Sequence, residues 1–162
     1  MIQNEGTLTL RGAVVTGAGP GGSGIVNRGV LTLQTGAQVR NNSARQVGTK
    51  QLGGGIYNDG TLTMESGSVV GGRLRDRSIA FDGGGGIYNA AGTATLKAGS
   101  RVSGNIGGSI DAPTGGGGGV FVGGGTVLVE AKDILVNNYD IIIQNITNCG
   151  GNPVTPPGNC FG

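Results

Sequence analysis

Five short stretches along this chain have an apolar residue at every second position and mostly threonine between, the pattern of strands with one buried face. Each follows a glycine, at Gly6, Gly29, Gly60, Gly92 and Gly125. A second apolar stretch precedes each one and starts at Ile2, Ile25, Ile56, Ile87 and Val120. A third short strand follows, in which Val15, Val39, Val70, Val102 and Ile134 take equivalent positions. Each repeat therefore predicts three strands.

These repeats predict an all-β solenoid, a parallel β-helix of about five coils with three short strands in each coil. Equivalent strands of successive coils lie about 4.7–4.9 Å apart in such a fold. The alternation places Leu31, Leu62 and Ala94 in one inward stack and turns the threonines outward. We expect the β-helix to span residues 1–148, with a Gly/Pro-rich loop over 149–162.

An asparagine ends the first strand of four repeats, at Asn4, Asn27, Asn58 and Asn89. Stacked amides hydrogen-bond to one another in regular arrays, so we expect an internal ladder that stops at Val122 of the last repeat. Glycine runs at 53–55, 83–86 and 115–119 lead into the first strand. They predict corners where a positive φ or a close backbone contact excludes a Cβ atom.

Composition narrows the classes of function. Glycine occurs 38 times in 162 residues, far above the roughly 7% of ordinary proteins, yet hydrophobic residues make up 36% of the chain, enough for a core. With 11 basic and 9 acidic residues, the chain as a whole is not suited to coating nucleic acid. We predict no transmembrane segment and no signal peptide, because no apolar run of about 18 residues and no basic leader occur.

The segment GGGIYNDGTLTMESGSVV is repeated imperfectly as GGGGIYNAAGTATLKAGSRVSGN. It resembles the repeats of bacterial polymorphic outer-membrane proteins and related surface β-helix proteins. The resemblance covers about residues 2 to 138. It implies a right-handed single-stranded parallel β-helix, secretion or display at the cell surface, and a role in adhesion or surface display. It carries over no catalytic residue.

The two cysteines, Cys149 and Cys160, flank a segment rich in glycine and proline. We expect a disulfide between them, which would place the protein in an oxidising compartment. A pair of free thiols is the alternative. The tail also looks like the cysteine-containing tails that follow the repeats of the family named above.

Neither an enzyme nor a cofactor or metal site is predicted. Gly17, Gly19 and Gly22 spell a dinucleotide-binding fingerprint, but that site needs a helix behind the glycines and an acid about 20 residues later. Strands follow instead, so we reject this interpretation. Catalytic β-helices need carboxylates in register on adjacent coils, whereas Glu65 and Glu130 fall two coils apart. The chain also has no histidine.

The outward threonines form a candidate ice-binding face. On the predicted strands they lie about 6.6–6.8 Å apart along a strand and about 4.7–4.9 Å apart between coils. This lattice is similar to the Thr-x-Thr face of β-helical antifreeze proteins; the alternative is that threonine simply suits an exposed strand. The candidate residues are Thr7, Thr9, Thr32, Thr61, Thr63, Thr93, Thr95 and Thr126.

Insertions at about 43–52, 72–82 and 104–114 follow the third strand, so we expect all of them to emerge from one corner. Loops on a rigid scaffold commonly carry binding sites. A basic patch there would receive an acidic glycan or another anionic surface polymer; the alternative is a set of solvated loops. The candidate contact residues are Arg45, Lys50, Arg73, Arg75, Arg77 and Phe81.

The sequence thus predicts a non-enzymatic extracellular or cell-surface structural and adhesive module that binds a surface glycan or a protein ligand. One alternative is a self-assembling filament subunit, because the strand edges at the two ends of a β-helix attract another chain. We therefore expect end-to-end self-association. The other alternative is an ice-binding protein. Nucleic acid is not an expected partner, since few aromatic residues accompany the basic ones.

Overall fold

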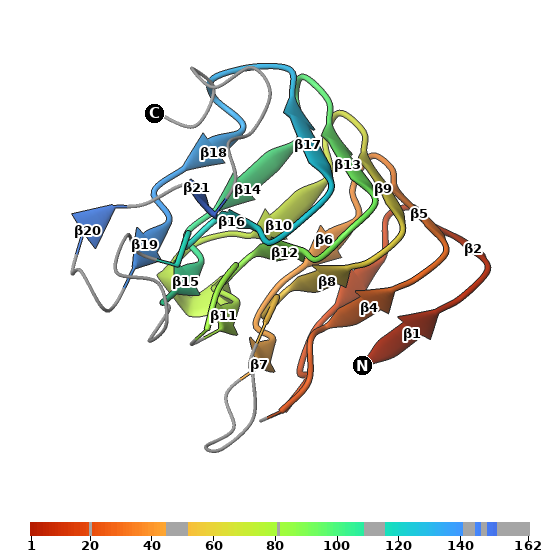
Figure 1. Ribbon diagram of the computed structural model, residues 1–162. Helices are drawn as coiled ribbons and strands as arrows, with labels where there is room; N and C mark the ends of the chain where they lie inside the picture. The colour runs from red at the N-terminus through yellow and green to blue at the C-terminus, as the bar shows by residue number, and fades with distance from the viewer. Residues whose placement is uncertain are drawn as a thin grey trace.

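In the computed structural model of the chain, equivalent strands of successive repeats pair in parallel, one coil upon the next (Figure 1). The structure describes residues 1–19, 21–44, 52–80, 82–108, 116–140, 145–146 and 149–151. The fold is nearly all β, a parallel β-helix, as the repeats predict. The strand pairing does not define the hand of the winding, so the right-handed sense stays a prediction.

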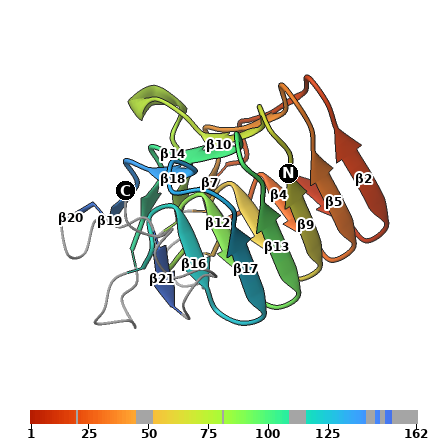
Figure 2. The same ribbon diagram turned by 90° about the horizontal axis from the view of Figure 1, so that it is seen from above.

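Two sheets contain the first and second strands of each repeat. Sheet A consists of β1 (Ile2–Asn4), β4 (Ile25–Asn27), β8 (Ile56–Asn58), β12 (Ile87–Asn89), β16 (Val120–Val122) and β21 (Cys149–Gly151). Sheet B consists of β2 (Thr7–Leu10), β5 (Val30–Leu33), β9 (Thr61–Met64), β13 (Thr93–Leu96) and β17 (Thr126–Val129). Figure 2 shows the arrows of sheet B side by side in that order, which forms a regular outer face.

Two further sheets complete the winding. Sheet C consists of β3 (Val14–Val15), β6 (Gln38–Val39), β10 (Val69–Gly71), β14 (Arg101–Ser103) and β18 (Leu135–Val136). Sheet D consists of β7 (Ser43–Ala44), β11 (Ile79–Ala80), β15 (Ile106–Gly107), β19 (Tyr139–Asp140) and β20 (Asn145–Ile146). Among the described strands, only β20 pairs in an antiparallel way, with β19.

Sheet D corrects the prediction of three strands per coil, because each coil after the first has a fourth strand. Its members have only two residues each, too few for an alternating pattern to appear in the sequence. The number of coils also differs slightly from five, since β21 adds a sixth strand to sheet A. Residues Cys149–Gly151 at the start of the predicted terminal loop thus pair with β16, while 152–162 lie outside the described residues.

The core is a set of apolar stacks inside the winding. Leu31, Leu62 and Ala94 pair in one register and are fully buried, as predicted. Fully buried apolar side chains gain about 1.5–3 kcal/mol each relative to exposure, but every member needs the coils above and below it. The equivalent residues of the first coil, including Leu8 and Leu10, are only partly buried. This coil has one neighbour among the described residues, β5 beside β2 in sheet B.

The third-strand stack differs from the prediction in its last member. Val15, Val39, Val70 and Val102 pair as expected, but Val102 pairs with Leu135, so the choice of Ile134 was wrong. Leu135 follows its second strand at the same distance along the chain as the valines of the three preceding coils. Ile134 is buried as well, and its carbonyl accepts the amide hydrogen of Val102 at 2.8 Å.

The predicted asparagine ladder runs through sheet A. Asn4 Nδ2 donates to Asn27 Oδ1 at 2.7 Å, Asn27 Nδ2 to Asn58 Oδ1 at 2.7 Å, and Asn58 Nδ2 to Asn89 Oδ1 at 2.6 Å. The ladder ends where Asn89 Nδ2 donates to the carbonyl of Gly124 at 2.8 Å, beside the coil that carries Val122. These amides are buried and bonded to one another, so the column is a structural feature.

The glycine corners before sheet A also follow the prediction. Gly53, Gly84 and Gly117 adopt φ of 64°, 59° and 55° at equivalent positions. A Cβ on the next residue, Gly54 or Gly85, would overlap the backbone of sheet D. The tight corner therefore requires glycine for both conformation and space.

Candidate functional site

A second polar column, which the sequence analysis missed, lies at the corner between sheets C and D. Asn42, Ser78, Asn105 and Asn138 each stand one residue before a strand of sheet D, and all four are buried. Asn42 Oδ1 accepts from the amide of Ala18 at 3.0 Å, and Asn42 Nδ2 donates to Val15 O at 3.1 Å. Each asparagine of this column thus satisfies the backbone of the preceding coil.

Ser78 interrupts this column. Asn105 and Asn138, in the two coils after that of Ser78, make the same two kinds of bond as Asn42. Ser78 is too short for them, and its Oγ has no hydrogen-bond partner among the described residues although it is fully buried. The interruption coincides with an insertion, because residues 71–77 separate Val70 from Ser78, whereas two residues separate Val39 from Asn42.

The insertion 71–77 folds back onto the preceding coil. It contains a short 3₁₀ turn, η1 (Leu74–Asp76), which stands out from the body as the yellow-green coil in Figure 2. Arg40 Nη1 and Asp76 Oδ1 are 2.5 Å apart, and the amide of Asn41 donates to the carbonyl of Asp76 at 2.9 Å. An asparagine at position 78 would bond to the preceding coil. In its place, Asp76 of the insertion makes the two bonds to that coil.

The contact between Asp76 and Arg40 turns the one acidic side chain of the insertion away from its three arginines. Arg73, Arg75 and Arg77 are all exposed, while Asp76 is turned onto Arg40. Arg101 begins β14 on the outer face of sheet C and is exposed as well. These arginines form a positively charged surface that includes Arg101, which the sequence analysis did not select.

The predicted common corner for the basic loops is wrong. Ser43 and Ala44 form β7, so residues 45–51 follow sheet D, whereas the insertion 71–77 precedes it. The fourth strand was too short to detect in the sequence, and both kinds of insertion were therefore assigned to the same turn. Arg45, Lys50 and Phe81 lie outside the described residues, so their part in a contact surface stays a prediction.

The threonines of sheet B form two columns in register. The first column holds Thr7, Val30, Thr61, Thr93 and Thr126, and the second holds Thr9, Thr32, Thr63, Thr95 and Leu128. Their side chains are exposed or half-buried, and Val30 and Leu128 are 43% and 37% exposed. The structure thus brings the predicted threonines together on one face.

Sheet A carries an aromatic stack on its outer face. The rings of Tyr57 and Tyr88 lie 5.7 Å apart with an interplanar angle of 12°, and those of Tyr88 and Phe121 lie 5.4 Å apart at 5°. Burial and the neighbouring Tyr57 raise the pKa of Tyr88 above its ordinary value. Because Tyr88 has a ring on each side, it offers little of its ring face to a ligand; the stack braces the coils.

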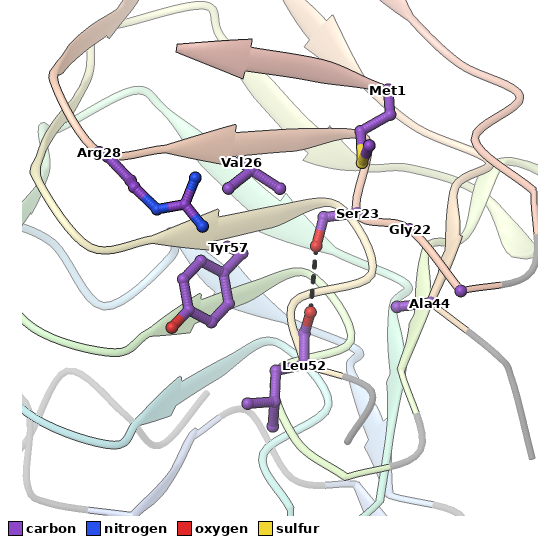
Figure 3. A pocket seen from close by; sticks show the side chains of 9 residues that line it. Met1, Gly22, Ser23, Val26, Arg28, Ala44, Leu52 and Tyr57 are labelled. Carbon is purple, nitrogen blue, oxygen red and sulfur yellow. Dashed lines mark hydrogen bonds between the residues drawn. The ribbon is translucent and has the colours of Figure 1, made fainter. Parts of the chain in front are cut away.

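A small hollow of about 220 Å³ lies beside this stack (Figure 3). Arg28, Val26 and Tyr57 line one side of it, and Met1 lies opposite. Ser23 Oγ donates to the carbonyl of Leu52 at 3.1 Å across its floor. Among the described residues that line the hollow there is no acidic residue, whereas glycoside hydrolysis uses a pair of them.

Charged residues at the corner between sheets B and C form a column along the axis. Lys97 Nζ lies 2.9 Å from Glu65 Oε1, and Glu130 Oε2 accepts from the amide of Ala98 at 3.0 Å. The hydrogen bond and the charge of Glu65 raise the pKa of Lys97. Glu65 and Glu130 are thus separated by a lysine rather than placed as a carboxylate pair.

Other candidate chemistry is limited in the part of the chain that the structure describes. It contains no group of three or more His, Cys, Asp or Glu residues that would hold a metal ion. The glycines at 17–22 are followed by β4, a strand, where a dinucleotide site needs a helix. None of the described cysteines is a free thiol, but Cys160 lies outside these residues, so its pairing with Cys149 stays a prediction.

Comparisons with known proteins do not assign the chain to a family. A scan against protein-family models, a search of curated proteins and a search of solved structures each found no match. Within the described residues, no helix has the length and apolar character needed to cross a bilayer. The fold defines the class, a parallel β-solenoid, and the surfaces of this solenoid are where a function is to be sought.

Proposed function

We propose that the chain is a non-enzymatic structural and adhesive module of an extracellular or cell-surface protein. Support comes from the division of its polar and aromatic side chains into those that join the coils and those that face solvent. Amides, aromatic rings and the Lys97–Glu65 pair bond along the axis and hold the coils together. Outside these columns, the insertion 71–77 leaves the regular winding and presents arginine side chains to solvent.

The single observation that carries the proposal is this division between a stacked scaffold and a projecting insertion. A rigid framework that holds an irregular loop is the usual arrangement of binding proteins. The resemblance to bacterial surface repeats supports an extracellular location. A disulfide between Cys149 and Cys160 belongs to the same proposal, because disulfides persist in oxidising compartments.

Location in the source cells tests the proposal. Intact cells are treated with a protease that does not enter them, and the protein is followed with an antibody. We expect loss of the protein from intact cells, or its recovery in the medium, while an internal enzyme stays whole. Retention of the full signal until the cells are lysed would contradict an extracellular role.

The disulfide is tested on the same material. Protein denatured without reductant is treated with a thiol-reactive label, and a second sample is reduced first. We expect label on Cys149 and Cys160 only after reduction. Equal labelling in both samples would mean free thiols and would remove this support for an oxidising compartment.

Ice binding is a second candidate because the two threonine columns keep register across all five strands of sheet B. The test is the thermal hysteresis of the parent protein and of Thr63→Tyr, which places a large side chain in the middle of the face. Gln38→Tyr on sheet C is the matched control. A parent protein without hysteresis ends this candidate; activity lost in Thr63→Tyr and kept in Gln38→Tyr supports it.

A further inference from the structure

We infer that the outer face of sheet C, together with the insertion 71–77, binds an acidic polysaccharide. The inference rests on the proposed function, since it names the ligand of the adhesive module. We call this surface the arginine face; it consists of Arg40, Arg73, Arg75, Arg77 and Arg101. Five arginines stand here against one acid, Asp76, on a chain whose net charge is only +2.

The insertion presents three of these arginines in a fixed arrangement. Asp76 is anchored through its carboxylate to Arg40 and through its carbonyl to the amide of Asn41. The amide of Asp76 also donates to the carbonyl of Arg73 at 2.7 Å, which closes the turn. Arg73, Arg75 and Arg77 are exposed, and no ion pair within the described structure neutralises them.

Sheet C extends the positive surface along the solenoid axis. Val14, Gln38, Val69 and Arg101 form its outward column, and none of them is acidic. Glu65 and Glu130 lie at the corner before this sheet and are engaged by Lys97 and the amide of Ala98, while the exposed Asp133 stands two residues before Leu135 of β18, the last strand of the sheet. A chain-like anion that follows sheet C from Arg40 to Arg101 would therefore meet arginines in three successive coils before it reaches Asp133.

The chemistry of the surface favours a carboxylated or sulfated glycan. Guanidinium groups bind carboxylate and sulfate oxygens through paired hydrogen bonds, each charge-assisted. A fixed insertion also loses less side-chain and loop freedom when a ligand binds. Single-stranded nucleic acid fits less well, because its bases need aromatic platforms. Among the described residues, the arginine face has none, and the aromatic stack lies on sheet A.

The experiment measures binding of the purified chain to fluorescent heparin and to polygalacturonate, with neutral dextran and single-stranded DNA as comparisons. We expect binding to the two acidic glycans that weakens with salt, as exposed charge pairs do. Arg75→Gln/Arg77→Gln should bind at least about tenfold more weakly, since it removes two exposed charge contacts to the glycan. Arg101→Gln should bind about threefold more weakly, since it removes one exposed charge contact.

A matched control removes the same charge elsewhere. Arg11 and Arg28 are exposed but lie off the arginine face, at the corners beside sheet B. Arg11→Gln/Arg28→Gln should bind within about twofold of the parent if position rather than net charge decides affinity. Thermal unfolding of every variant confirms that these surface changes leave the fold intact.

The variant Asp76→Asn tests whether the glycan binds to arginines that Asp76 positions or is attracted only by the net positive charge. Simple attraction predicts tighter binding, because the variant loses a negative charge and so gains one unit of net positive charge. If Asp76 positions the insertion, the variant binds more weakly despite that gain, and Arg75→Gln then has a smaller effect in its background. Tighter binding with an unchanged Arg75→Gln effect would overturn the positioning role.

Three outcomes overturn the inference as a whole. The first is no binding to either acidic glycan at low salt. The second is equal loss of affinity in the arginine-face and control double variants, and the third is tighter binding to DNA than to both glycans. Each outcome leaves the proposed function standing, since protease treatment of intact cells tests location without reference to the ligand.

Discussion

The two buried polar columns of this β-helix satisfy the hydrogen bonds of their side chains in different ways. In sheet A, the asparagines bond to one another, at 2.6–2.7 Å, through four successive coils. At the corner between sheets C and D, the asparagines bond mainly to the backbone of the coil before them. The first column has an asparagine at each of four successive levels, whereas the second has a gap at Ser78, where Asp76 of the insertion 71–77 binds Arg40 instead.

This difference explains where the fold accepts variation. A ladder of amides depends on identical residues at each level, so an insertion beside it would break a chain of bonds. A column whose members bond mainly to the backbone can lose one member while the others keep their backbone bonds; among the described residues, its one bond between side-chain amides joins Asn105 Nδ2 to Asn138 Oδ1, at 3.1 Å. The described insertion that departs from the winding lies beside the second column, and it carries the arginines of the proposed binding surface.

The largest expected effect comes from breaking the first column. Asn58→Leu keeps the shape of the side chain but removes its bonds to Asn27 and Asn89, and the partner groups stay buried. Each unsatisfied buried group costs about 1–3 kcal/mol, so we expect a loss of about 3–4 kcal/mol in the free energy of unfolding. Urea denaturation measures it; a loss below about 1 kcal/mol would mean that the ladder contributes little.

Double-mutant cycles compare coupling within the two columns. Asn27→Leu and Asn58→Leu remove neighbours that share a bond, so their effects should be non-additive by about 1 kcal/mol or more. Asn42→Leu and Asn105→Leu act on separate coils with Ser78 between them, and should add within about 0.5 kcal/mol. Equal coupling in both pairs would remove the distinction between the columns.

The gap at Ser78 predicts a contrast between two buried serines. Ser68 Oγ donates to the carbonyl of Glu65 at 2.6 Å, whereas Ser78 Oγ has no partner among the described residues. Ser68→Ala should therefore lose about 1 kcal/mol of stability, while Ser78→Ala should be neutral or slightly stabilising. Both are compared by urea denaturation, and a loss in Ser78→Ala equal to that of Ser68→Ala would show that its hydroxyl is bonded.

The smallest expected effect is a pH dependence from the aromatic stack beside the first column. The pKa of Tyr88 is raised in the folded chain, so above its ordinary value of 10.0 the unfolded chain releases this proton first. The free energy of unfolding should then fall as pH rises above 10, because the folded chain holds more protons. Tyr88→Phe should flatten that fall, and identical pH curves for variant and parent would contradict the assignment.

Much of the winding could be predicted from the chain because its apolar positions repeat. The register of Leu31, Leu62 and Ala94 and the Asn4–Asn89 ladder follow from residues that recur at equivalent places. The two-residue strands of sheet D could not be found, since two residues carry no periodicity. Because these strands were not predicted, the insertions before and after sheet D were wrongly assigned to one corner.

The sequence by itself determined which residues face inward on sheets A and B, because a strand alternates its side chains and water excludes apolar ones from the surface. Only the tertiary structure decided how charge is distributed around the coil. Asp76 lies among Arg73, Arg75 and Arg77 in the chain, yet it binds Arg40 of the preceding coil. That pairing depends on which coils lie next to each other, and no local pattern in the insertion encodes it.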